Sequence, residues 1–106
     1  MDYVILKKDT DGGVIAINKS VFQAITEITI QDIENIIFQP SSFSKRTVNV
    51  KVDHNLLNIE ADVKVKYGAS VSETCGLVQS KIYENIVFMT GFKPSEVKVN
   101  VTGFEI

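Results

Sequence analysis

The sequence predicts an α+β fold, and three observations lead to that class. Apolar and polar residues alternate with a period of two through residues 48–52 and 57–67, which is typical of strands with one buried face. In residues 19–30 and 70–90, apolar residues recur every three or four positions, as they do in amphipathic helices. The chain has 106 residues, the size of one ordinary domain. We therefore expect one domain over residues 1–106, with both helices on the apolar face of one sheet.

The amino-terminal part is predicted to contain a turn, a short strand and the first helix. Residues 11–13, Asp-Gly-Gly, are typical of a turn, and the β-branched residues 14–17 predict a strand. Asn18 or Ser20 can cap a helix over residues 19–30, because either side chain can accept a hydrogen bond from a free backbone amide. The expected buried stripe of this helix is Val21, Ala24, Ile25 and Ile28, with Thr29 as a further candidate.

The middle of the chain carries the strongest strand signal. Residues 36–38 predict a short edge strand, and the polar residues that follow predict a loop. The alternating segments 48–52 and 57–67 predict an antiparallel hairpin that turns at residues 53–55. A shift of one residue would expose every valine of this pair to water, so its register is strongly specified.

The carboxy-terminal part predicts a second helix and a last strand. Ser70 or Ser72 can begin the helix, Glu73 completes a capping box with Ser70, and Gly91 ends it. The apolar stripe of this helix is Cys75, Val78, Ile82, Ile86 and Met89.

Residues 96–104 alternate again and predict the final strand. The predicted order is strand, helix, strand, strand, helix, strand. The hairpin is antiparallel and the crossover through the second helix is parallel, so the sheet is mixed. A ferredoxin-like strand arrangement matches this order, although residues 14–17 are short for the central place that it gives the first strand.

Composition and charge exclude several functions. With 11 Lys and Arg against 13 Asp and Glu, the net charge of −2 creates no overall field that attracts a polyanion. The longest apolar runs have four residues, whereas a membrane-spanning helix needs about 20. The first residues carry an early acid and a short apolar stretch, which is not the pattern of a secretory signal. We expect a cytoplasmic protein with no membrane span of its own.

Neither the single histidine nor the single cysteine predicts catalysis. His54 falls in the predicted hairpin turn, where a polar residue is expected in any case. Cys75 falls on the apolar stripe of the second helix, and a nucleophilic thiol there would need a nearby base. One histidine and one cysteine also cannot supply the ligands of a zinc site. We expect no catalytic residue, no cofactor and no metal site.

Two surfaces are candidates for binding a partner. Ile36, Ile37, Phe38 and Phe43 form either an uncovered apolar edge that contacts a protein partner, or the completion of the core near the helix ends. Lys51, Lys64, Lys66 and Lys98 fall on the polar face of the predicted sheet and form an alternative, nucleic-acid-binding patch. RNA-binding sheets stack bases on aromatic side chains, and the polar positions of this sheet hold none, so nucleic acid is the less favoured partner.

Five segments together resemble one protein family. They are residues 13–18 (GVIAIN), 48–53 (VNVKVD), 63–68 (VKVKYG), 84–91 (ENIVFMTG) and 97–103 (VKVNVTG). The chain resembles the alkaline shock protein family of low-GC Gram-positive bacteria, also described as envelope stress response proteins.

The resemblance implies a non-enzymatic cytoplasmic protein of cell-envelope homeostasis and stress. Members associate with themselves, and some are held peripherally at the membrane by a separate integral-membrane partner. The resemblance therefore implies a homo-oligomer or a complex with a membrane-anchored protein, and it carries over no catalytic residue. Residues 30–45 depart from the family pattern and the long charged tails of larger members are missing, so we expect a short member.

Overall fold

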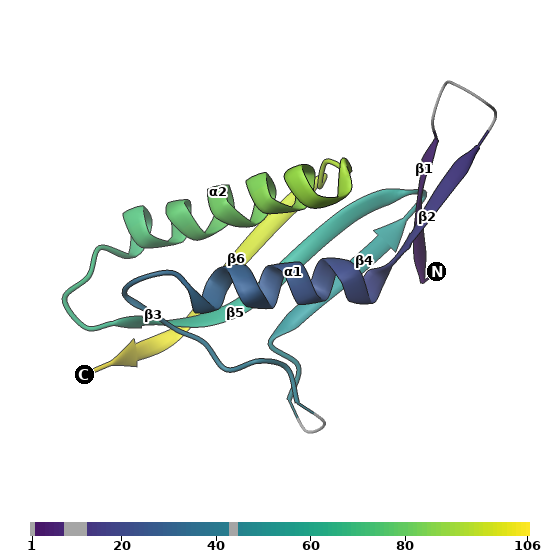
Figure 1. Cartoon of the computed structure of the whole chain (residues 1–106). Helices are drawn as coiled ribbons and strands as arrows, with labels where there is room; N and C mark the ends of the chain where they lie inside the picture. The colour runs from purple at the N-terminus through teal and green to yellow at the C-terminus, as the bar shows by residue number, and fades with distance from the viewer. Residues whose placement is uncertain (1, 8–12, 43–44) are drawn as a thin grey trace.

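The computed structural model describes residues 2–7, 13–42 and 45–106, and within them it confirms the α+β class. Figure 1 shows two helices side by side over one face of a sheet, with a separate two-stranded ribbon at one end. The elements in chain order are β1 (Tyr3–Lys7), β2 (Val14–Asn18), α1 (Lys19–Gln31), β3 (Ile36–Ile37), β4 (Val48–Asp53), β5 (Leu56–Lys66), α2 (Val71–Thr90) and β6 (Glu96–Glu105).

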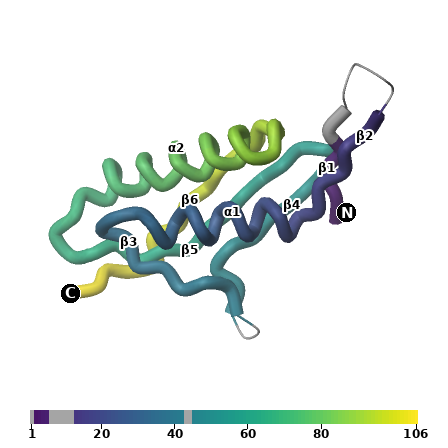
Figure 2. Tube along the Cα trace, in the orientation of Figure 1, coloured from purple at the N-terminus to yellow at the C-terminus, as the bar shows by residue number. Residues whose placement is uncertain are grey.

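Strand β5 is the centre of the main sheet, and every other strand of that sheet pairs with it. On one side β4 pairs antiparallel, from Val48 opposite Ala61 to Asp53 opposite Leu56, and β3 continues the same edge. On the other side β6 pairs parallel to β5 after the crossover through α2. The predicted hairpin, the parallel last strand and the mixed sheet are confirmed, and the path can be followed in Figure 2.

The core lies between this sheet and the two helices. Alternate side chains of β4 and β5 point to the helices and are buried, as the period of two predicts. Helix α1 packs against β4, and α2 packs against β6. The buried apolar side chains of β4 and β5 are Val48, Val50, Leu57, Ile59, Ala61, Val63 and Val65.

The predicted ferredoxin-like arrangement is wrong, because β2 does not join the main sheet. It pairs only with β1, a strand that the sequence did not predict, from Tyr3 opposite Asn18 to Lys7 opposite Val14. Strand β5 is already flanked by β4 on one side and β6 on the other along residues 58–61, so no edge is left there for another strand.

The β1–β2 ribbon is fastened to the domain at its base. Val4 is fully buried in the core, and Ile17 packs against it. The side-chain amide of Asn55, in the β4–β5 turn, bonds to the backbone of Ile5. Its Oδ1 accepts a hydrogen bond from Ile5 N (3.0 Å), and its Nδ2 donates one to Ile5 O (3.1 Å). Asn55 has φ of 61°, a left-handed conformation that asparagine tolerates well. The predicted turn before β2 lies outside the described residues except for Gly13.

Helix α1 begins where the sequence predicts, but it buries a different face. Asn18 caps it, with Oδ1 accepting a hydrogen bond from Ser20 N (2.9 Å). The prediction of Val21 and Ile28 as buried is wrong, because they are 42% and 64% exposed. The observed buried residues are Phe22, Ile25, Thr26, Thr29 and Ile30. The two threonines can lie in the core because their hydroxyls donate to backbone carbonyls one turn earlier.

Helix α2 is close to its prediction. Ser70 caps its start, and Gly91 ends it with φ of 75°, the left-handed conformation that favours glycine. Val78, Ile82 and Ile86 are fully buried, as the stripe predicts. The prediction for Met89 is wrong, because this side chain is 65% exposed beyond the end of the buried stripe.

Candidate functional site

The helix pair carries an apolar groove on its outer side. It opens between the start of α1 and the end of α2, where the two helices lie beside one another, and its volume is about 510 Å³. We call it the helix groove. Its lining residues are Ser20, Val21, Ala24, Ile25, Ile28, Thr29, Asn85, Met89 and Thr90. None of them is charged, so the groove suits an uncharged, apolar occupant.

Three of the four polar side chains that line the helix groove, those of Thr29, Asn85 and Thr90, are hydrogen-bonded within the protein. Thr29 Oγ1 donates to Ile25 O (2.7 Å) and accepts a hydrogen bond from Asn85 Nδ2 (2.9 Å), which links the two helices. Thr90 Oγ1 donates to Ile86 O (2.6 Å). An occupant of the groove therefore meets mainly methyl and methylene groups rather than hydrogen-bonding partners.

Two large apolar side chains near the end of α2 are exposed: Met89, which lines the groove, and Phe88, which precedes it in the sequence. Phe88 is 88% exposed and Met89 is 65% exposed. Solvated apolar side chains of this size are ordinary when they are scattered, but here Met89 lines an apolar groove. Its side chain therefore adds to the apolar surface that a partner can cover.

Sequence reasoning missed this groove because it assigned Val21, Ala24, Ile28 and Met89 to the core. A signal was nevertheless present. In α1, residues 21, 24 and 28 and residues 22, 25 and 29 make two neighbouring stripes at helical spacing. A helix that packs on one side only can bury one of them fully, so the second stripe predicts an exposed apolar strip.

Of the predicted partner residues, Ile36, Ile37 and Phe38 are each half-buried. Ile36 and Phe38 are half-buried and pack against the core cluster. Ile37 lies opposite Lys64 on the other face of the sheet, where it is half-buried. Phe43 lies outside the described residues. The placement of Ile36 and Phe38 favours the interpretation that they complete the core.

The four lysines of the alternative patch do lie on the open face of the sheet, but acids surround them. Lys98 Nζ lies 3.7 Å from Glu60 Oε2, and Lys64 Nζ lies 3.9 Å from Glu105 Oε1. Lys51 also acts electrostatically on Glu60, and Lys66 is exposed at the end of β5. The patch is therefore a mixed-charge surface rather than a basic one.

A hydrogen-bonded group lies at the centre of this open face. Asn100 Nδ2 on β6 donates to Glu60 Oε2 (2.8 Å) and to Asp62 Oδ1 (2.9 Å) on β5. The Asn100 hydrogen bond lowers the pKa of Glu60 below its usual value, and the positive charges of Lys98 and Lys51 act in the same direction. The Asn100 amide thus favours the ionised form of Glu60 and joins the Glu60 and Asp62 side chains by hydrogen bonds.

His54 and Cys75 lie near opposite ends of the molecule. His54 is at the β4–β5 turn, almost fully exposed, with Nδ1 3.0 Å from Asp53 Oδ1. Cys75 is half-buried in the first turns of α2, and burial raises the pKa of its thiol. The length of β5, about 33 Å for its eleven residues, separates the two ends, so the pair cannot act on one substrate.

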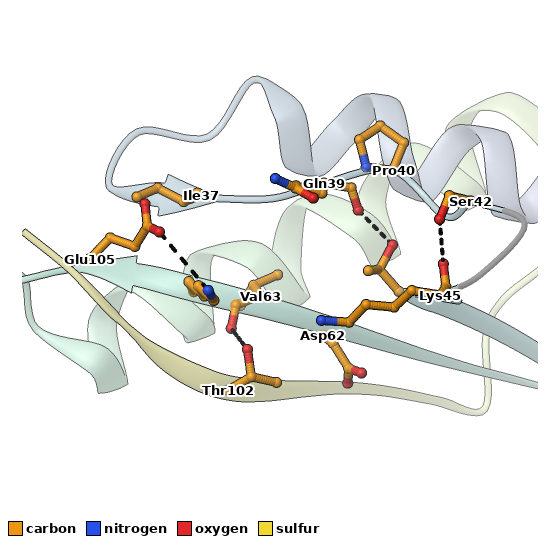
Figure 3. Close-up of a pocket in the computed structure, with 11 residues that line it drawn as sticks. Ile37, Gln39, Pro40, Ser42, Lys45, Asp62, Val63, Thr102 and Glu105 are labelled. Atoms are coloured by element: carbon orange, nitrogen blue, oxygen red, sulfur yellow. Dashed lines mark hydrogen bonds and ion pairs between the residues drawn. The ribbon is translucent and has the colours of Figure 1, made fainter.

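A small polar cleft lies beneath the segment that joins β3 to β4. Figure 3 shows the Lys45 side chain reaching toward Asp62, and the hydrogen bonds from Thr47 to Gln39 O and from Thr102 to Val63 O. The cleft volume is about 170 Å³, below the range of about 300–1,000 Å³ that is usual for ligand pockets. Among the described residues, no three His, Cys, Asp or Glu side chains are placed to hold a metal ion together.

Comparison with known protein families identifies the family to which the chain belongs. A sequence model of the alkaline shock protein 23 family, described by its cell envelope-related function, matches residues 7–106. The chain belongs to the alkaline shock protein 23 family. The resemblance inferred from the sequence motifs is therefore confirmed, and the family's function concerns the cell envelope.

The motifs that carried the resemblance to the alkaline shock protein 23 family have structural roles. Gly68 follows β5 with φ of 94° and Gly91 follows α2 with φ of 75°, two left-handed positions that favour glycine. Val97, Val99 and Val101 lie on the helix side of β6, and Val97 and Val99 pack against the core. These motifs fix the fold, and they mark no cluster of reactive groups.

No curated protein matches the sequence of this alkaline shock protein 23 family member significantly. Within the described residues, neither helix is both long enough and apolar enough to cross a bilayer.

Proposed function

We propose that this protein serves the cell envelope by binding rather than by catalysis, and that its helix groove holds an apolar helix of a membrane-anchored protein partner. The observation that carries the proposal is the groove itself. It is an apolar recess without a charged lining residue, on the outer side of α1 and α2, and its lining residue Met89 is largely exposed.

A helix is the occupant that this groove suits best. Recesses between two packed helices commonly bind an amphipathic helix, whose apolar residues recur at three- and four-residue spacing. Because no charged side chain lines the groove, acidic and basic peptides gain no ion pair there. The internally bonded Thr29 and Asn85 also offer little to an extended strand, which needs backbone hydrogen-bond partners.

The distribution of reactive groups supports a non-enzymatic role. His54 and Cys75 are far apart, and the small polar cleft contains Lys45 and Lys64 together with Asp62 and Glu105. Those charges balance one another, and neither His54 nor Cys75 lines that cleft. A cytoplasmic location, peripheral to the membrane through the partner, is part of this proposal.

The alternative function, contact with nucleic acid through Lys51, Lys64, Lys66 and Lys98, has weaker support. Two of these lysines pair with acids on the same face, and counterion release needs lysines free to neutralise phosphates. If the alternative is correct, the protein binds nucleic acid with an affinity that falls steeply as salt is raised.

The proposed function is tested by site-specific photo-crosslinking in cells, with a photoreactive residue placed at Met89 or, as the control, at Leu77. Leu77 is a 47% exposed residue of α2 outside the groove, so it matches Met89 in helix and in character. The expected result is a crosslink to one membrane-anchored protein from position 89 and none from position 77.

The captured protein is then tested directly with a synthetic peptide of its crosslinked helix. We expect Ile28→Asp to weaken peptide binding at least tenfold, because it places a carboxylate in an apolar recess, and Leu77→Asp to leave binding unchanged. Circular dichroism checks that both variants fold. Equal crosslinking from the two positions, capture of this chain alone, or binding that Ile28→Asp leaves unchanged would each refute the proposal.

A further inference from the structure

Strand β6 forms an edge of the main sheet with backbone groups that no strand uses. It pairs with β5 on one side, and in the described part of the chain no strand pairs with its other side. The carbonyl of Val97 accepts a hydrogen bond from the Gln79 side chain (3.2 Å), so it points away from β5. Because successive residues of a strand alternate in direction, the N–H and C=O groups of Val99 and Val101 also point outward.

In the middle of this edge, a lysine is the one usual protection against pairing. Natural edge strands are blunted by proline, by charged side chains such as lysine, by bulges or by a covering segment. Here Gln79 covers one carbonyl at the start of the edge, and a bulge follows Val101 at its end. Between them the edge residues are valines, and the one charged side chain, Lys98, lies on the open face.

We propose that two copies of this protein pair through β6, antiparallel, with the two-fold axis at Val99. In this register Val99 lies opposite Val99 of the second copy, and Val97 lies opposite Val101. All of these residues direct their N–H and C=O groups to the shared edge, so the two copies of β6 can form an antiparallel hydrogen-bond ladder. The main sheets of the two copies then become one continuous sheet. The Gln79 side chain moves off the Val97 carbonyl when the second strand arrives. The surface is separate from the helix groove, so the inference goes beyond the proposed function and does not rest on it.

Charges on the open face support this register. Lys98 comes opposite Asn100 of the second copy, and the next strand there presents Asp62. Glu96 comes opposite Thr102 of the second copy, with Lys64 beside it on the next strand. Lys98 and Glu96 therefore each have an opposite charge about two strand spacings away, roughly 10 Å, and no like charge directly opposite.

The shape of the helix-side surface supports the same register. Phe104 lies opposite Val65, on the helix side of the sheet, and is 55% exposed. It is five residues beyond Val99, and the bulge takes up one of them, so it comes opposite Ser95 of the second copy. Ser95 belongs to an open recess of about 340 Å³ between α2 and β6. The lining of that recess includes Gln79, Tyr83, Pro94 and Val97, which an inserted phenylalanine ring would contact.

The first test is the mass of the full chain in solution over a range of concentrations, by sedimentation equilibrium or native mass spectrometry. We expect a dimer whose dissociation constant rises at least tenfold in Val99→Pro. Proline removes an N–H that no group of the same chain uses, and edge strands tolerate it where that N–H faces outward. If Val99→Pro fails to fold, Phe104→Asp gives the same comparison from the solvent-exposed side of the interface.

The second test reads the register. In a Cys75→Ser background, Val99→Cys places two thiols opposite one another, with Cα atoms about 5.5 Å apart, within the range of a disulfide. Lys98→Cys is the matched control, because its two copies lie about 8 Å apart in the proposed ladder. We expect rapid oxidation to a covalent dimer from position 99 only. A monomer at every concentration, a dimer that Val99→Pro leaves intact, or equal crosslinking from both positions would overturn the proposal.

Discussion

The antiparallel strand pairs β4–β5 and β1–β2 differ in how they are stabilised. In the β4–β5 pair, apolar and polar side chains alternate, so one face is buried under the helices and the other is open. In the β1–β2 ribbon, both faces carry apolar residues, and Tyr3, Ile5, Val14 and Ile15 are 39–60% exposed. Strand pairing alone therefore contributes little to the stability of a two-stranded unit. The first pair is stable because helices cover it, and the second is held by its contacts with the domain.

The largest expected effect tests that comparison with one isoleucine from each pair. Ile59→Ala, in the core, should lower the free energy of unfolding by about 2–5 kcal/mol, because it leaves a cavity under the helices. Ile15→Ala, at a site that is 39% exposed, should cost less than about 1 kcal/mol. Urea unfolding of both variants measures the difference, and equal losses would contradict the comparison.

A second variant tests whether Phe38, just after β3, contributes to the core that the helices and the main sheet form. Phe38→Asp should lower the free energy of unfolding by about 2–3 kcal/mol, because it places a carboxylate against the core cluster. Phe38→Leu is the control and should cost about 1 kcal/mol, since it keeps an apolar contact. If Phe38→Asp keeps full stability but loses association with itself or a partner, Phe38 is a contact residue instead.

A smaller effect is expected from the turn that holds the ribbon. Asn55→Gly keeps the left-handed backbone but removes both hydrogen bonds to Ile5. Amide hydrogen exchange at Ile5 should become about tenfold faster, while exchange at Ile59 in β5 stays unchanged. His54→Gly alters the same turn without touching β1 and serves as the control. Faster exchange throughout β5 would show that the ribbon and the main sheet unfold together.

The smallest effect is a change in pH dependence. Because the folded-state pKa of Glu60 is lowered, its contribution to stability is complete above the usual glutamate pKa and is lost as pH falls through the lowered value. Asn100→Ala removes the main cause, so the melting temperature should fall less steeply toward acid pH than in the unchanged protein. Asn58→Ala, on the same face, is the control. A slope that Asn100→Ala leaves unchanged would assign the effect to Lys98 and Lys51.

The parts of the fold that the sequence predicted are those in which local pattern and tertiary environment agree. Alternation specified which face of β4 and β5 is buried, because a shift of one residue would expose the valines. The face of α1 was mispredicted because two apolar stripes compete, and because Thr26 and Thr29 satisfy their own hydroxyls and can enter the core. Strand β1 was missed because its short apolar run acquires a structure only through its contacts with β2 and Asn55.

The candidate site was less predictable than the fold for a related reason. A stripe of apolar residues has the same spacing whether it faces the core or a partner, so Val21, Ile28 and Met89 were assigned to the interior. The open edge of β6 depends on which strands flank β5, and that follows from topology rather than from any local motif.

The irregularity between β5 and β6 determines which side of the sheet the last residues occupy. Val63 lies opposite Val101, but Lys64 lies opposite Gly103, so Thr102 is an extra residue in β6. If Thr102 instead paired with Lys64 in a continuous ladder, Phe104 would come opposite Lys66, with its ring turned away from both helices. The bulge at Thr102 therefore keeps the chain's final aromatic side chain on the helix side of the sheet, and a relative without the extra residue would carry that ring on the same side.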